Sequence, residues 1–258
     1  MLRSLREVYR YRNLVGYLVR LDLKVRYRGS ILGFLWTLLN PLLLMLVMSA
    51  VFSRFGRVSE KSYALFLLSA LMVWVFFDHS ISSGLTAIIK QRSLLQKIYV
   101  PKLVFPVTLV TSNVVNLVFF FAAYLIIASF TSVGIPATTP LLVPVVLMLF
   151  VVSLGGALLM ATLNVFFRDF THLTAAIMRA LFYLTPIFYS PSMFGPHAER
   201  YLRLNPMYYP VIAARDVLYY GVVPPAQIWL VGFGAAFFVL VVGLWAFVRN
   251  EVKFIYYA

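Results

Sequence analysis

Long apolar runs separated by short polar segments dominate the chain. Residues 31–52 carry no charge, and residues 63–89 contain one acid, Asp78. Residues 103–167 are uncharged over a length that exceeds one span, and turn formers at 134–140 divide them in two. Two further runs follow: 173–189 and 227–248. Because about 20 apolar residues cross the ~30 Å hydrocarbon layer as a helix, the pattern predicts an all-α fold with six transmembrane helices.

The first 29 residues form a basic, amphipathic arm. Its apolar residues recur at helical spacing: Leu14, Leu18, Leu21 and Val25. A basic stripe repeats at intervals of four: Arg20, Lys24 and Arg28. We expect a helix in the membrane interface with its apolar face in lipid, and a turn at Gly29 into the first span. The alternative is an arm that only orients the chain in the membrane.

A second basic segment, residues 84–106, connects the second and third spans. It contains four basic residues and no acid: Lys90, Arg92, Lys97 and Lys102. Its apolar side is formed by Ile88, Ile89, Leu94, Leu95 and Ile98. Such a segment can insert into a groove of a soluble partner. A positively charged loop that only sets the topology is the competing interpretation.

The composition supports a membrane protein. Of 258 residues, 62% are hydrophobic and 12% are charged, and the mean hydropathy is +0.92. A soluble domain would need more polar residues to cover its surface. The chain has no cysteine, which excludes disulfides, Cys-based metal sites and thiol nucleophiles. No cleavable signal peptide is evident, because the first apolar run is too long for one.

Basic residues are distributed unequally between the two sides that six spans define. Sixteen of the 22 Lys and Arg residues fall on the side of the termini, and six fall on the opposite side. This positive-inside bias predicts that both termini lie in the cytoplasm. With this hydropathy, the net charge of +14 indicates anionic headgroups rather than nucleic acid. We expect one transmembrane domain over 1–258: an arm at 1–29, a bundle at 30–248 and a cytoplasmic tail at 249–258.

The segment between the fifth and sixth spans is rich in proline and aromatic residues. A freely solvated loop would not hold so many apolar side chains, so we expect short gate helices on the external side that dip back toward the membrane. Some aromatic rings near this segment are candidates for a channel or gate lining: Phe182, Tyr183, Phe188, Tyr189, Tyr208 and Tyr209. The alternative is that these rings belong to the interfacial belts or pack between helices.

Two charges lie within the predicted spans, Asp78 in the second and Arg179 in the fifth. Ionisable groups at such depth usually face the protein interior or water, so the two residues are candidates for a pathway and for a mutual ion pair. Snorkelling of Arg179 to the headgroups is the alternative. The dipeptides Asn40-Pro41 and Thr185-Pro186 predict kinks in the first and fifth spans.

Four co-linear blocks resemble the permeases of type-2 ABC exporters for polysaccharides. They are DLKVRYRGSILGFLWTLLNPLL at 22–43, LNVFFRDFTHL at 163–173, LFYLTPIFYS at 181–190 and NPMYYPVIAARDVLYYG at 205–221. The resemblance covers essentially the whole chain. This group exports lipid-linked O-antigens, capsular polysaccharides and teichoic acids. The resemblance therefore implies a channel-forming subunit in a bacterial inner membrane, with no enzymatic activity of its own.

The resemblance also implies a homodimer bound to two copies of a separate phosphate-loop ATPase. In such permeases the arm, the connection after the second span and the turn after the fourth span contact the ATPase. The matching docking residues are Arg20, Lys24, Arg26, Arg28, Lys90, Arg92, Lys97, Arg168 and Asp169. ATP and magnesium are expected on that partner and no cofactor on this chain, which lacks a G-x-x-x-x-G-K-[ST] phosphate loop.

Three other functions compete with this interpretation. A membrane-embedded glycosyl- or acyltransferase would need positioned acids or a His/Ser pair, but the eight acids are scattered. A secondary transporter driven by an ion gradient usually has internal repeats, and no convincing repeat is found. A related ABC permease for a small hydrophobic substrate would share the fold, and the polysaccharide-type blocks argue against it.

Overall fold

The computed structural model describes residues 2–29, 33, 35–54, 62–92, 100–131 and 133–254. Within these ranges all regular structure is helical, as the apolar pattern predicted. The elements in chain order are α1 (Leu2–Arg10), α2 (Arg12–Arg26), α3 (Leu35–Arg54), α4 (Tyr63–Leu85), η1 (Ile89–Gln91), α6 (Val104–Ser129), η2 (Thr139–Leu141), α7 (Leu142–Phe166), α8 (Phe170–Leu184), η3 (Pro191–Phe194), α9 (Gly195–Leu202), α10 (Tyr208–Arg215), η4 (Asp216–Tyr220) and α11 (Ala226–Asn250).

Each of the six apolar runs corresponds to one helix of this bundle. In the described part of the chain, 4 helices are long and apolar enough to cross a membrane: α4, α6, η2 with α7, and α11. The other two apolar helices are shorter: α8 has 15 residues, and the apolar part of α3 covers Leu38–Val51. At 1.5 Å per residue α8 is about 22 Å long, less than the ~30 Å hydrocarbon layer.

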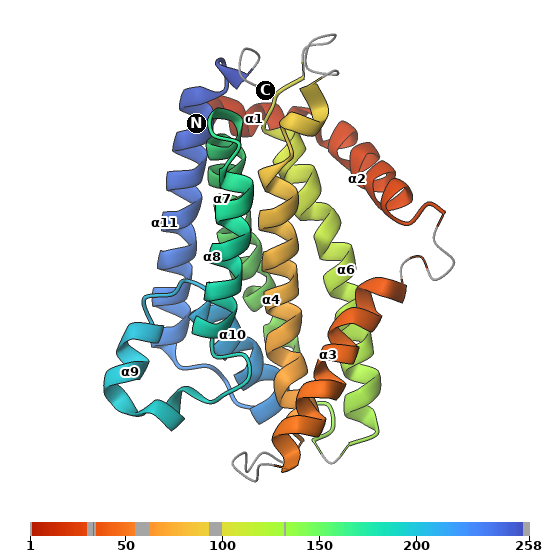
Figure 1. Ribbon diagram of the computed structural model, residues 1–258, viewed down its shortest axis with the longest axis vertical. Coiled ribbons are helices and arrows are strands. Elements are labelled where there is room, and N and C mark those ends of the chain that lie inside the picture. Colours follow the sequence, from red (N-terminus) through yellow and green to blue (C-terminus); the bar gives the residue numbers. More distant parts are fainter. Residues whose placement is uncertain are drawn as a thin grey trace.

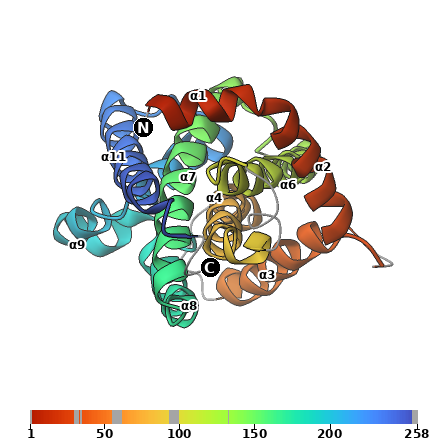
Figure 2. The ribbon, with the colours of Figure 1, turned by 90° about the horizontal axis from the view of Figure 1, so that it is seen from above.

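Helix α4 lies at the centre of the bundle, and the other helices surround it (Figure 2). In its most apolar window 78% of the residues are buried, against 28% in α11. Both helices are apolar on all sides, so the sequence pattern alone does not distinguish a central helix from a lipid-facing one. The exposed apolar side chains of α11 include Leu230, Phe237 and Phe238, and they form a surface suited to lipid.

Both ends of the described chain lie at one end of the bundle (Figure 1). This end carries α1, residues 86–92 and 100–103, the turn at 167–169 and residues 251–254, and we call it the basic end. Phe254 is fully buried there against Phe247, so part of the predicted cytoplasmic tail packs onto the bundle. Burial lowers the pKa of Lys102, whose ammonium donates a hydrogen bond to the carbonyl of Glu251.

The N-terminal arm folds into two helices that follow the bundle. α1 crosses the basic end, and α2 descends beside α6, so that α3 begins near the middle of the bundle (Figure 1). Leu14 and Leu18 pack against the apolar cluster at this end, whereas Val25 stays 61% exposed. The predicted apolar face is therefore divided between protein and surroundings. Gly29 has a φ of 78°, which confirms the predicted turn after the arm.

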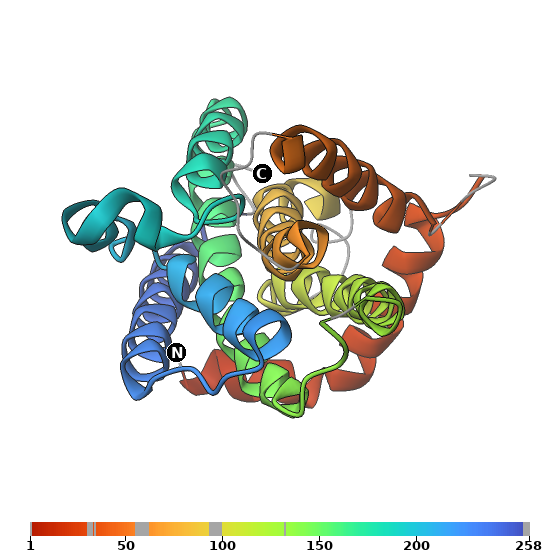
Figure 3. The same cartoon turned by 90° about the horizontal axis from the view of Figure 1, so that it is seen from below.

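The two predicted proline kinks have different outcomes. Pro41 lies inside α3, and the kink expected there stays a prediction. The kink at Thr185-Pro186 is a correction, because α8 ends at Leu184 and Thr185 is extended with φ −87° and ψ 134°. A residue before proline is sterically disfavoured in the helical region, and Pro186 has no N–H to continue the helix. Short helices follow, and α10 lies beneath the bundle between α4 and α11 (Figure 3).

Small residues permit the closest helix contacts. α7 and α11 form the most extensive helix pair, and Gly243 of α11 lies directly against the carbonyl of Gly155 in α7. A Cβ atom at either position would overlap backbone atoms of the other helix. In lipid, helix association depends on such close packing, because apolar side chains are equally well solvated by lipid tails.

Replacing Gly243 by Ala should separate α7 from α11 and lower the stability of the bundle by about 2 kcal/mol, a typical cost of overpacking. The matched control is Gly234→Ala in the same helix, where no described atom lies within 4 Å of the new methyl group. Thermal unfolding of the detergent-solubilised protein measures both variants. Equal melting temperatures for the two would contradict the close contact.

Candidate functional site

A lateral groove of about 670 Å³ runs between α3, α4 and α8, and it contains both intramembrane charges. Its principal lining residues are Trp36, Asn40, Pro41 and Leu44 of α3, Trp74, Asp78, His79 and Ser82 of α4, and Ala175, Met178, Arg179 and Phe182 of α8. α3 and α8 lie on the same side of α4 and form its two walls (Figure 2). Polar groups at membrane depth thus share an otherwise apolar cavity.

Asp78 of α4 and Arg179 of α8 both line this groove. No ion pair joins them among the described residues, and the Arg179 Nε donates a hydrogen bond to the carbonyl of Ala175 at 3.1 Å. The carboxylate and the guanidinium are therefore brought to one cavity without being locked together. Such an arrangement leaves both groups available to a polar substrate or to water in the groove.

Aromatic rings gather where the groove approaches the end of α8. Phe182 contacts Trp74, with ring centroids 5.4 Å apart, and packs edge-to-face on Phe188 at 4.8 Å. Tyr183 completes the cluster at 5.5 Å from Phe182 and is 67% exposed. The Tyr189 hydroxyl donates to the carbonyl of Tyr183 at 3.0 Å. Four of the six predicted lining residues are thus neighbours.

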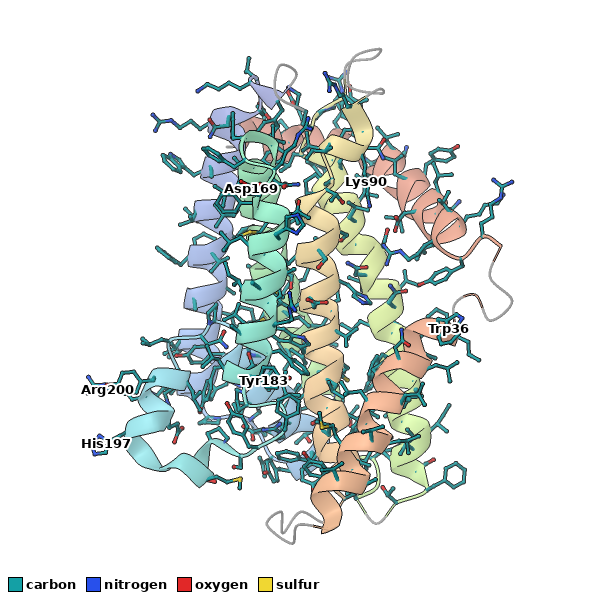
Figure 4. The ribbon with its side chains drawn as sticks, viewed as in Figure 1. Trp36, Lys90, Asp169, Tyr183, His197 and Arg200 are labelled. Atoms are coloured by element: carbon teal, nitrogen blue, oxygen red, sulfur yellow. The ribbon has the colours of Figure 1, made fainter. Side chains whose placement is uncertain are left out.

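The other two predicted rings, Tyr208 and Tyr209, have different surroundings. Both are buried in α10, and neither lines the lateral groove. The Tyr208 hydroxyl donates to Glu199 Oε1 at 2.8 Å, and burial raises the pKa of Tyr208 to about 12. Hydrogen bonds from Arg203 and Tyr208 lower the pKa of Glu199. The bond of Tyr208 connects α10 to α9, and the Tyr209 hydroxyl donates to the carbonyl of Arg203, just after α9, at 2.9 Å. α9 itself projects from the bundle with His197 and Arg200 (Figure 4).

Arg215 is a residue whose burial sequence reasoning missed, because it was counted only among the six basic residues on the side opposite the termini. Its side chain is 1% exposed and lies 3.8 Å over the ring of Phe66 in α4. Its Nη2 donates to the carbonyls of Pro186 at 2.7 Å and Ile187 at 2.9 Å. These carbonyls follow α8, so Arg215 attaches α10 to the end of α8. The sequence feature that could have indicated this burial is the position of Arg215 directly after the apolar run at 211–214.

A partly buried polar network joins α2 to the bundle. Arg26 donates to Asn113 Oδ1 at 2.9 Å and to Asp22 Oδ2 at 2.8 Å. Asn113 of α6 in turn donates to Ser80 Oγ of α4 at 3.2 Å. The Tyr27 hydroxyl donates to an oxygen of Asn116 on the same face of α6 at 2.9 Å. Arg26, a predicted docking residue, is thus occupied by contacts within the chain.

The remaining docking residues that the structure describes are exposed. They are Arg20, Lys24, Arg28, Lys90, Arg92, Arg168 and Asp169, whereas Lys97 lies outside the described residues. Lys90 and Asp169 both lie near the basic end, on different connections (Figure 4). The structure therefore brings parts of three sequence segments to one side of the molecule. In the described ranges no cluster of His, Asp or Glu is arranged to hold a metal ion.

A second groove, of about 680 Å³, lies at the basic end between α2, α4 and α6, and we call it the arm groove. Its charged lining residues are Asp22, Arg26 and Lys90. His79 and Ser82 of α4 line this groove as well as the lateral groove, so the two cavities meet on either side of one helix turn.

Within the described residues, an all-helical bundle with 4 helices long and apolar enough to cross a membrane indicates a multi-pass membrane protein. Residues 13–219 match the model of the ABC-2 type transporter family, and the chain belongs to this family. The resemblance found in the four sequence blocks is thereby confirmed at the level of the family.

Curated relatives carry a common description. The chain is 34% identical over 230 residues to the O-antigen export system permease protein RfbA of Myxococcus xanthus, with 88% of each chain covered. It is 29% identical over 236 residues to a protein of the same name from Klebsiella pneumoniae, with 90% of each chain covered. The similarity thus extends over nearly the whole length of these permeases.

Replacing Arg215 by Met should destabilise the protein by about 3 kcal/mol, because buried carbonyls would lose a charged donor. Arg203→Met is the control, since Arg203 forms an exposed pair with Glu199 that is worth about 0–1 kcal/mol. Denaturant or thermal unfolding in detergent compares the two variants. If Arg215→Met lowers the free energy of unfolding no more than Arg203→Met does, the buried guanidinium does not have the stabilising role assigned to it.

Proposed function

We propose that this chain is the channel-forming permease subunit of an ATP-driven exporter that moves a lipid-linked polysaccharide across the bacterial inner membrane. The observation that carries the proposal is the end-to-end similarity to permeases named for O-antigen export, within the ABC-2 type family. Both the fold class and the arrangement of polar groups are compatible with it.

The proposed topology has six spans, with α3 and α8 as the first and fifth and with both termini in the cytoplasm. An even number of crossings is supported by the position of α1 and the end of α11 at the same end of the bundle (Figure 1). The excess of Lys and Arg in the segments at that end supports a cytoplasmic location. Residues 185–190 would complete the passage that the short α8 begins.

The proposed assembly is a homodimer with two copies of a phosphate-loop ATPase, which binds ATP and magnesium. The exposed cations of α2, of the connection after α4 and of the turn before α8 support a docking surface at the basic end. Arg26 would act differently from its neighbours in this assembly. Because it joins α2 to Asn113, it would transmit a push on α2 into α6 and α4.

The proposed path runs along the lateral groove. Two copies that face each other through α3 and α8 would combine their grooves, with Trp36, Trp74 and Phe182 presenting rings to the polymer. Sugars have apolar C–H faces, so aromatic rings bind successive units weakly and let them slide. The exposed ring of Tyr183 lies at the end of α8, next to the proposed external gate of α9 and α10.

The proposed cycle uses differences in energy between two states of the bundle. ATP binding would close the ATPase pair, and the closure would displace α2 and the connection after α4. α3 and α8 would then tilt and widen the path, because they have fewer contacts with α4 than α6 and α7 have. Nucleotide shifts this equilibrium only as far as it binds the two states differently.

The proposed energy source is tested by reconstituting the chain with its ATPase in vesicles that contain a lipid-linked glycan. Transport should require ATP and should continue when an ionophore dissipates the proton gradient. An ATPase with an inactivated phosphate loop serves as the control and should abolish transport. Arrest by the ionophore would instead support a secondary transporter, while transport of a small apolar compound but no glycan would support a different cargo.

Reversing the charges of the connection after α4 tests the docking surface. Lys90→Glu, Arg92→Glu and Lys97→Glu together should weaken co-purification of the ATPase by about tenfold, since like charges then face each other across the interface. Arg200→Glu on α9 is the matched control, because this exposed cation lies near the opposite end of the bundle (Figure 4). Undiminished ATPase binding and transport in the triple variant would remove the docking assignment.

A further inference from the structure

The arm groove combines an apolar half with a cationic half. Its apolar lining comes mainly from Leu18, Leu21, Val25, Phe105 and Leu109. The polar lining lies on α4 and the connection that follows it, and it includes Ser82, Ser83, Lys90 and Gln91. A volume of about 680 Å³ far exceeds the ~30 Å³ that one water occupies in the liquid. The groove therefore suits an amphiphile rather than a few ordered waters.

One buried hydroxyl in this groove lacks a partner. Thr108 of α6 is 4% exposed, and its Oγ1 forms no hydrogen bond with any described residue. Thr108 lines the arm groove, and its Oγ1 atom has less than 1 Å² of accessible surface. A buried hydroxyl left unbonded is costly, so Thr108 gains from any polar group that its hydroxyl can reach from the groove.

The charge of the groove favours an anion. Asp22 is already neutralised by Arg26 at 2.8 Å, and Arg26 is further engaged by Asn113. Lys90 contributes an additional, exposed ammonium, which leaves two cations and one carboxylate in the lining. Phosphate oxygens accept hydrogen bonds from an ammonium and from hydroxyl groups together, as in charge-assisted phosphate sites.

We propose that the arm groove binds an anionic phospholipid of the leaflet at the basic end. The phosphate lies between Lys90 and Thr108, and the acyl chains leave along Leu21 and Val25 of α2. The position of the groove suits a membrane lipid. Lys90 follows the end of α4, where a headgroup would lie, and Val25 is 61% exposed at the rim, where acyl chains would lie. Anionic lipids of the cytoplasmic leaflet are attracted to juxtamembrane cations. This binding does not depend on the export function proposed above.

A bound lipid would support the position of α2. The groove separates α2 from α4 on one side, while the Arg26–Asn113 bond joins α2 to α6 on the other. A lipid in the groove would fill this space and contact both helices. A segment of the partner ATPase is the competing occupant, but the apolar rim formed by Leu21 and Val25 matches acyl chains more directly.

The test uses the absence of cysteine from the chain. A Val25→Cys variant of the full chain, without ATPase, is labelled with bimane at the rim of the groove and placed in phosphatidylcholine nanodiscs. Spin-labelled phosphatidylglycerol or spin-labelled phosphatidylcholine is then titrated as a quencher. Phosphatidylglycerol should quench at about fivefold lower content, the factor expected for one cation beside an anionic headgroup.

Lys90→Gln in this labelled background should abolish the preference for phosphatidylglycerol, and Lys90→Arg should keep it. Thr108→Val should weaken it in part. Lys253→Gln is the matched control, because Lys253 is exposed at the same end and does not line the groove. Equal quenching by the two lipids before any of these substitutions, or equal effects of Lys90→Gln and Lys253→Gln, would overturn the proposal.

Two additions identify the occupant. Soluble glycerol phosphate, which has no acyl chains, should not relieve quenching by phosphatidylglycerol. Relief would assign the groove to a soluble phosphate compound instead of a lipid. Adding the partner ATPase should leave the quenching unchanged. Loss of quenching on ATPase binding in the labelled chain, together with no effect of Lys90→Gln on lipid preference, would assign the groove to an ATPase segment.

Discussion

A guanidinium that is withdrawn from water must find its hydrogen-bond partners within the chain. The buried Arg215 and the partly buried Arg26 satisfy this requirement in different parts of the bundle. Arg215 bonds the carbonyls that follow α8 and stacks on Phe66 of α4. Arg26 bonds Asp22 and Asn113. The bonds of Arg215 thereby attach α10 to the core, and the bonds of Arg26 attach α2.

The core to which they attach is built from apolar helices that approach closely. α7 and α11 meet at Gly155 and Gly243, and Gly84 of α4 lies against Ala157 of α7. α3 and α8 lie on the other side of α4 and leave a groove between them. The bundle is thus divided into a closely packed half and a grooved half. A transport path is more readily accommodated in the grooved half, because widening it breaks fewer contacts.

Helix α4 contributes lining residues to both grooves, which lie on two of its sides. His79 and Ser82 line the lateral groove and the arm groove, and Asp78 faces only the lateral one. In the proposed exporter the lateral groove belongs to the substrate and the arm groove to a membrane lipid. A displacement of α2 would alter the arm groove directly and would reach the lateral groove through α4. The polar network of Arg26, Asn113 and Ser80 is the connection between these elements.

The order of the helices was readable from the residues, because each apolar run is long and is bounded by charges or turn formers. The family was readable too, from four blocks of local sequence. The turn at Gly29 and the short helices after α8 also follow from local rules on glycine, proline and aromatic density. Pro186 shows the limit of such rules, since a proline in an apolar run either kinks a helix or ends it, and neighbouring helices decide which.

The sequence by itself determined the helical class, the number of apolar segments and the positions of the rare charges, since these depend on composition and spacing along the chain. Only the tertiary structure decided that α4 is central and α11 peripheral, that Arg215 is buried, and that Asp78 and Arg179 share one cavity. Apolar helices look alike to a periodicity argument when both lipid and protein are apolar surroundings. The partners of a buried charge come from segments far apart in the chain, and their positions are set by packing.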